Sequence, residues 1–107
     1  MNIMMQRYEQ VKEHNKKLHD LIEHVDLIKR GAMLKVYSSI EQNDKLYFAQ
    51  MSLIYQQIDD IMEDSNIDIK KKSDIEHQLL KSGYYLTTKW EKESEVYIKE
   101  LHRIMYA

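Results

Sequence analysis

The sequence predicts an all-α protein: an antiparallel helical bundle or hairpin of two to three long helices with coiled-coil-like seams. Three observations predict this fold class. Pro is absent and Gly occurs twice in 107 residues, whereas strand-rich folds need many Gly and Pro residues at their turns. The chain is rich in good helix formers such as Glu, Lys, Gln, Leu and Met. Its apolar residues recur at alternating steps of three and four, which places them along one side of a helix.

The length and composition narrow the function classes. A chain of 107 residues is enough for a single domain over residues 1–107. A net charge of -2 argues against nucleic-acid binding, which favours a basic surface. The absence of Cys excludes thiolate chemistry and fits a reducing compartment such as the cytoplasm. No apolar run approaches the about 18 residues that cross a membrane, and the first 30 residues lack the apolar core of a signal peptide. We therefore expect no membrane insertion.

The first helix is predicted over about residues 3–30. Residues at alternating steps form its seam: Met4, Arg7, Val11, His14, Leu18, Leu21, Val25 and Ile28. The seam is apolar from Leu18 onward and interrupted before it. Two cations followed by Gly31 are typical of a helix C-terminus, because the macrodipole favours the cations there and Gly tolerates the C′ conformation.

The second helix is predicted over about residues 33–63. Its stripe consists of Met33, Tyr37, Ile40, Asp44, Tyr47, Met51, Ile54, Ile58 and Ile61. The step from Ile28 to Met33 is five residues, so the stripe rotates near Gly31. The chain either reverses there, or continues as one helix about 90 Å long that needs a partner or a homodimer, or starts a new helix near residue 39 at the capping box Ser38-Ser39-Ile40-Glu41. We favour a break between residues 31 and 39.

A connector over 64–72 and a third helix over 73–105 complete the prediction. Ser73 and Glu76 form a capping-box pattern that starts this helix. Lysines 70–72 then precede the helix and fold back toward the acidic end of the second one, avoiding a first turn where the macrodipole disfavours cations. The stripe of the third helix is Leu79, Leu80, Gly83, Leu86, Trp90, Tyr97, Leu101 and Ile104. Gly83 costs up to about 1 kcal/mol inside a helix, and close approach of another helix is a reason to keep it.

The segment EDSNIDIKKKSDIE, residues 63–76, resembles the start of a calcium-binding EF-hand loop. Asp64, Asn66 and Asp68 match the first, third and fifth positions of that loop. Ile69 occupies the position where the loop requires Gly, and Ile75 occupies the position of the bidentate Glu. The three lysines between them would repel a dication. The sequence therefore predicts a helix-connecting turn and no calcium site.

The spacing of the histidines and the absence of catalytic motifs argue against a metal site and an active site. His14, His19 and His24 are five residues apart, about 140° per step around a helix, so they do not share a face. His19 with Glu23, and Asp20 with His24, each offer two metal ligands, fewer than the three or four that zinc takes. The sequence contains no Glu-x-x-His motif, Gly-x-Ser-x-Gly motif or phosphate-binding loop. We expect a non-enzymatic protein without metal or cofactor.

The eight tyrosines suggest a protein interface, because Tyr, Trp and Met are enriched at interfaces. Tyr84 and Tyr85 are adjacent, so their side chains must point in different directions from the helix. The predicted function is protein–protein interaction with a helical partner. The candidate contact residues are Tyr84, Tyr85, Trp90, Tyr97, Leu101 and Met105.

The length of about a hundred residues, the helical content and the lack of Cys and Pro resemble the small helical proteins of Gram-positive type VII secretion. These include WXG-type hairpins and the partners of LXG effector domains. The resemblance implies a non-enzymatic adaptor that pairs with a longer helical effector and accompanies it to export. Trp90 is followed by Glu91-Lys92, where WXG proteins carry Trp-x-Gly. A phage- or plasmid-borne inhibitor of a host protein and a bacteriocin-immunity-type bundle are the alternatives.

Overall fold

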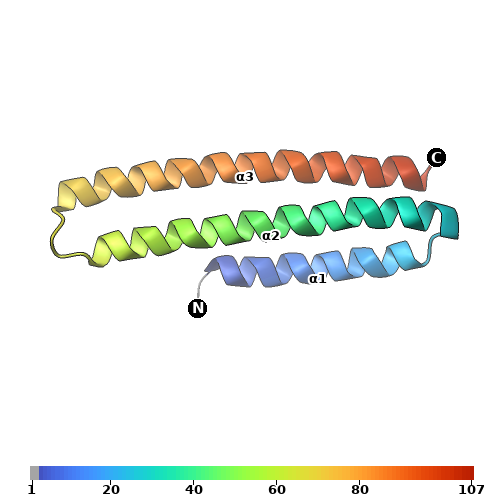
Figure 1. Ribbon diagram of the computed structural model, residues 1–107, viewed down its shortest axis with the longest axis horizontal. Helices are drawn as coiled ribbons and strands as arrows, with labels where there is room; N and C mark the ends of the chain where they lie inside the picture. The colour runs from blue at the N-terminus through green and yellow to red at the C-terminus, as the bar shows by residue number, and fades with distance from the viewer. Residues whose placement is uncertain (1–2) are drawn as a thin grey trace.

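The computed structural model describes residues 3–107, which form three α-helices (Figure 1). Helix α1 spans Ile3–Glu23, α2 spans Leu27–Glu63 and α3 spans Ile69–Met105. Successive helices run antiparallel, and α2 lies between the other two and packs against both (Figure 1). The Cα trace measures 61 × 24 × 14 Å, so the molecule is elongated and flattened. The predicted all-α bundle is confirmed.

The junction between α1 and α2 lies at residues 24–26, so the predicted break between 31 and 39 is wrong. Asp26 is the N-cap of α2, and its carboxylate accepts a hydrogen bond from the Lys29 backbone N–H at 3.2 Å. This bond satisfies one of the free N–H groups of the first turn. Gly31 lies inside α2 without a positive φ. The five-residue step at Ile28 has a simple cause, since Ile28 is 90% exposed and belongs to no seam.

Of the eight residues predicted for the seam of the first helix, alternate ones face the interior. Met4 is buried, and Val11, Leu18 and Val25 are half-buried. Between them the interior positions are Tyr8, Asn15 and Ile22, whereas Arg7, His14, Leu21 and Ile28 are exposed. A heptad can be divided as four then three as well as three then four, and the helix uses the first division. Ile22 is fully buried as a result.

The junction between α2 and α3 is also shorter than predicted, with a connector over 64–68. Asp68 is the N-cap of α3 and accepts from the Lys71 backbone N–H at 2.9 Å, so Ser73 lies inside the helix. Lysines 70–72 consequently occupy the first turns, where the Asp68 carboxylate offsets their unfavourable interaction with the helix dipole. Lys72 does fold back, but its ammonium donates to the Met62 carbonyl at 2.9 Å rather than pairing with an acid.

Two apolar clusters form the core, and each draws on all three helices. The first consists of Ile22, Met33, Tyr37, Ile40 and Leu101. The second consists of Met4, Tyr47, Phe48 and Met51, with Leu86 and Trp90 of α3 packed against it. A Cβ on Gly83 would lie 3.2 Å from Met51 Cε, so α2 and α3 approach closely there, as predicted.

The three helices differ in length, so one part of the molecule contains three helices and the other part contains two. Helix α1 has 21 residues, whereas α2 and α3 have 37 each. The ends of α2 and α3 therefore extend past α1 as a two-helix hairpin, at the left of Figure 1. We call residues 52–82 the overhang and residues 3–51 with 83–107 the three-helix region. No helix in the described part of the chain combines the length and apolarity of a membrane span.

Candidate functional site

The six predicted contact residues differ in how much of each side chain is exposed. Leu101 is 2% exposed and belongs to the first core cluster. Tyr97 and Met105 are half-buried against the same cluster. Tyr84 and Tyr85, in contrast, are 76% and 68% exposed. Of the six, these two tyrosines offer the most surface to another protein.

Trp90 is held by contacts inside the molecule. Its ring stacks on Tyr47, with centroids 4.2 Å apart and planes 4° from parallel, and it meets the edge of Phe48 at 5.5 Å. The Tyr47 hydroxyl is in turn 2.8 Å from the Thr87 hydroxyl. These contacts fix the ring between α2 and α3, so its position favours a role in the core over one in contacting a partner.

A buried carboxylate joins the three helices. Asp44 of α2 is 4% exposed. Its Oδ2 accepts from Asn15 Nδ2 of α1 at 2.7 Å, and its Oδ1 accepts from Trp90 Nε1 of α3 at 2.7 Å. Such charge-assisted bonds are stronger than neutral ones. Asp44 is the one charged residue of the predicted α2 stripe. Its partner Asn15 is seven residues from Tyr8 and from Ile22, and this spacing is the sequence signal that places Asn15 in the interior.

Around the exposed tyrosines, α3 presents an apolar surface on a rigid element. Leu80 lies one turn before Tyr84 on the same side of the helix and is 46% exposed. We call Leu80, Tyr84 and Tyr85 the tyrosine surface. A shallow hollow next to Tyr85 is also lined by His77 and Lys81. Tyrosine combines a large apolar ring with a hydroxyl, so this surface can bury area and still offer hydrogen bonds.

An open, polar cleft of about 550 Å³ lies between α1 and α2. Lys12, Lys16 and His19 line it from α1, with Tyr37 and Glu41 among the residues opposite. Burial raises the pKa of the Tyr37 phenol, and the negative charge of Glu41 raises it further. The His19 imidazole pairs with the Glu23 carboxylate at 3.5 Å instead of with a hydroxyl nucleophile. Charged and phenolic side chains of α1 and α2 thus line the cleft together.

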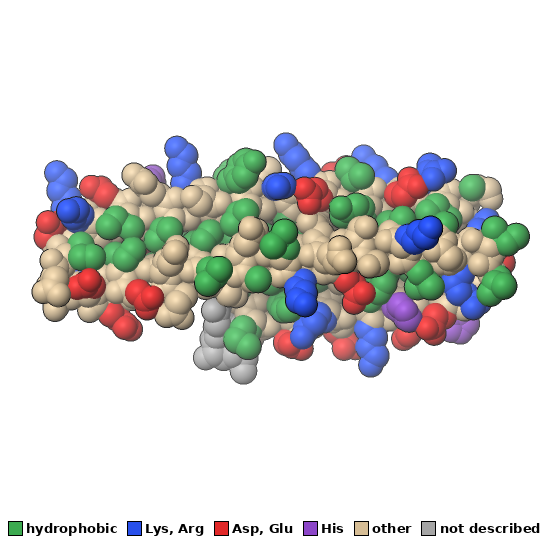
Figure 2. Space-filling view, viewed as in Figure 1, with side chains coloured by type: hydrophobic (Ala, Val, Ile, Leu, Met, Phe, Trp, Pro, Cys, Tyr) green, Lys and Arg blue, Asp and Glu red, His purple; other side chains and the backbone are tan. Residues whose placement is uncertain are grey.

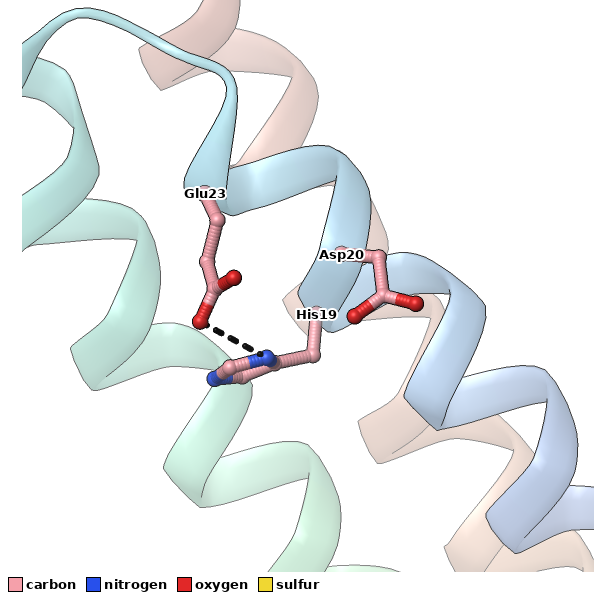
Figure 3. A group of neighbouring side chains, drawn as sticks. All are labelled: His19, Asp20 and Glu23. Atoms are coloured by element: carbon pink, nitrogen blue, oxygen red, sulfur yellow. Dashed lines mark ion pairs between the residues drawn. The ribbon is translucent and has the colours of Figure 1, made fainter.

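Three potential metal ligands meet near the end of α1 (Figure 3). Atoms of His19, Asp20 and Glu23 lie within 4.8 Å of one another. The four-residue spacing predicts that Asp20 and His24 pair through their side chains, but His24 Nδ1 lies 2.7 Å from the Asp20 backbone carbonyl oxygen instead. Figure 3 shows the His19 ring and the Glu23 carboxylate turned toward each other, with Asp20 to the side. Asp20 and Glu23 are exposed, and one helical turn supplies all three donors, which is the lower limit of a zinc site.

The acidic residues of the EF-hand-like segment serve the turn itself. Asp64 Oδ1 accepts from the Asn66 backbone N–H at 2.9 Å, and the Asp68 carboxylate caps α3. These are the local hydrogen bonds that Asp makes in turns and at helix N-termini. Ile69, at the position where the calcium loop needs Gly, is the first residue of the helix. The geometry is that of a capped connector.

Comparison of the chain with protein-family models, with curated proteins and with solved structures gave no match. The candidate site therefore follows from geometry alone. Among the six predicted contact residues, Tyr84 and Tyr85 are the two that do not pack into the core.

Proposed function

We propose that this protein is a non-enzymatic interaction module that binds a longer helical protein through the tyrosine surface of α3. The observation that carries the proposal is the exposure of two adjacent aromatic side chains, Tyr84 at 76% and Tyr85 at 68%. Their backbone is anchored, because the neighbouring Gly83 is buried against Met51.

Physical arguments support an interface at this place. A tyrosine has few rotatable bonds for its size, so burying it costs little conformational entropy per unit of contact area. Aromatic side chains are enriched in interfaces and among the residues that contribute most to binding. The helix fixes the backbone of both residues before binding, so only their side-chain rotamers remain to be ordered. Leu80 extends the apolar area by one turn.

The partner that fits the resemblance to type VII secretion proteins is a secreted effector with a long helical domain. In this proposal the protein meets the effector in the cytoplasm and accompanies it to the export machinery. An elongated molecule of 61 Å supports such pairing, because helices of that length can pack side by side over several turns.

The test is an affinity pull-down from native cells with three forms of the protein, read by mass spectrometry. Wild type should recover a helical effector, and the Y84A/Y85A variant should lose most of it. Tyr106→Ala is the matched control, because Tyr106 is 81% exposed but lies at the C-terminal end of α3. Circular dichroism should show equal helicity in all three forms.

Two outcomes would contradict the proposal. Full recovery of the effector by Y84A/Y85A would exclude the tyrosine surface as its binding site. Recovery of a host polymerase or helicase instead of an effector would favour the inhibitor alternative.

A further inference from the structure

The rows of α2 that face α1 continue into the overhang. Near the start of α1, the Tyr8 ring stacks on Phe48 with centroids 5.0 Å apart. Met4, Met5 and Tyr8 also line a hollow against Lys45, Phe48, Ala49 and Ser52. Residues seven apart on a helix lie on nearly the same side. The α1-facing side of α2 therefore continues as Tyr55, Asp59, Met62 and Glu63, which we call the docking row.

The docking row has the pattern of a helix-binding surface without a helix on it. Tyr55 is half-buried and Met62 is 48% exposed, and these two form an apolar ridge seven residues apart. Asp59 and Glu63 flank the ridge and are exposed. Along the same side in the three-helix region, Phe48 is only 4% exposed, since Tyr8 and Met4 of α1 pack on it together with Trp90 of α3.

The overhang carries the negative charge of the protein. Residues 52–82 hold seven acidic residues and four lysines, a net charge of -3, whereas the rest of the chain has a net charge of +1. Four of the acids, Asp59, Asp60, Glu63 and Asp64, stand at the C-terminal end of α2, where the helix dipole is also negative. Figure 2 shows acidic side chains gathered at this end of α2, at the lower left.

No ion pair between residues within 3–107 involves Asp59 or Glu63. Lys72 is half-buried at the start of α3, and its ammonium donates a hydrogen bond to the Met62 carbonyl. A helix C-terminus with unneutralised carboxylates attracts cations, and the apolar ridge beside them attracts an apolar stripe.

We propose that the docking row binds a basic amphipathic helix of a partner protein, lying in line with α1. Its apolar stripe packs on Tyr55 and Met62, and its Lys or Arg residues lie beside Asp59 and Glu63. The inference goes beyond the proposed function, because the docking row is a second surface, on α2, that the tyrosine surface of α3 does not include. A second copy of this protein is disfavoured, because pairing two overhangs would bring acids against acids.

The probe is a synthetic helix of about 16 residues, or about 24 Å, with Leu on one face and Lys on the other. Its fluorescence anisotropy reports binding to the full chain, and the same peptide with Glu for every Lys is the negative probe. The D59K/E63K variant should lower the affinity for the Lys peptide about tenfold or more. Cations at the end of α2 suit the helix dipole, so this variant should fold.

The matched control is E91K/E95K on α3, which makes the same change of charge at the same spacing outside the overhang. It should change the affinity less than about twofold, because its acids lie outside the contact. Equal weakening by both variants would overturn the proposal, since it would reveal a general charge effect. Absence of saturable binding by wild type, or equal binding of the Glu peptide, would also overturn it.

Two further measurements separate this proposal from the others. Y84A/Y85A should bind the Lys peptide normally while losing its effector. The two proposals, on the docking row and on the tyrosine surface, can therefore be refuted separately. A wild-type dimer seen by analytical ultracentrifugation and blocked by the Lys peptide would overturn the proposal in favour of a second copy.

Discussion

The three-helix region and the overhang use the same kind of helix but bury very different amounts of it. In the three-helix region, α1, α2 and α3 enclose two clusters, and side chains such as Ile22 and Met33 are fully buried. In the overhang, where two helices cover each other, Ile58 is the one side chain below a tenth exposed. Most helical stability in proteins comes from packing rather than from propensity. We therefore expect local stability to fall from the first region to the second.

The two regions also place their polar groups differently. The three-helix region buries Asp44 with Asn15 and Trp90 and satisfies both carboxylate oxygens. The overhang keeps its acids on the surface, at the end of α2. The buried network fixes how the three helices align, whereas Asp59, Asp60 and Glu63 remain exposed to solvent. The difference separates a region with a buried polar network from one whose acids lie at the surface.

The largest effect is expected from Asp44→Ala. It leaves the buried Asn15 amide and the Trp90 indole without their acceptor, so we expect a loss of about 3–5 kcal/mol in the free energy of unfolding. Asp60→Ala in the overhang is the control, because Asp60 is exposed and accepts from the exposed Gln56 amide. Urea denaturation monitored by circular dichroism measures both. A loss below about 1 kcal/mol at Asp44 would mean that water replaces its hydrogen bonds.

A pair of identical substitutions compares the packing of the two regions directly. Ile22→Ala removes a fully buried side chain of the three-helix region and should cost about 2–5 kcal/mol. Ile61→Ala removes a half-buried side chain of the overhang and should cost about 1 kcal/mol. Equal losses in urea denaturation would show that the overhang is packed as tightly as the rest.

The main stripes of α2 and α3 could be predicted from sequence because these two helices pack against each other along most of their length and keep one register. The stripe of α2 from Met33 to Met51 is buried as expected. Phe48 was missed because α2 has neighbours on two sides and buries a wider face than one stripe. In α1 the polar residue Asn15 concealed the register, and the predicted alternatives were exposed. Burial of a polar residue depends on its partner, Asp44, which lies 29 residues away.

Helix ends were harder to predict, because several caps compete in one short segment. Lys29-Arg30-Gly31 satisfies the rules for a helix end, yet Asp26 starts α2 before it. Ser73 satisfies the rules for a helix start, yet Asp68 caps α3 first. For the candidate site, the adjacency of Tyr84 and Tyr85 predicted that their side chains point in different directions, and both are exposed. The burial of Trp90 required its contacts with Tyr47 and Asp44.

The two N-caps test where local stability is low. Asp26→Ala and Asp68→Ala each remove one hydrogen bond to a first turn, which typically costs about 1 kcal/mol. In the three-helix region the loss at Asp26 should lower the global stability. At Asp68 we expect faster hydrogen exchange in the first turns of α3, with a smaller global change. A global loss that is larger at Asp68 would contradict the division into two regions.

The smallest effects come from the two glycines, which have the same helical backbone and different surroundings. Alanine in place of either should stabilise the helix by about 0.5–1 kcal/mol, because Gly loses more backbone entropy on folding. At Gly31 no neighbouring atom lies within 4 Å of the new Cβ, so Gly31→Ala should show the full gain. At Gly83 the new Cβ lies 3.2 Å from Met51 Cε, and this flexible side chain must shift by a few tenths of an ångström. Gly83→Ala should therefore gain less than Gly31→Ala in thermal unfolding, where about 1 kcal/mol shifts the midpoint by 4–8 °C. Equal gains would show that Met51 moves freely, and that the close packing of the three-helix region ends before it reaches Gly83.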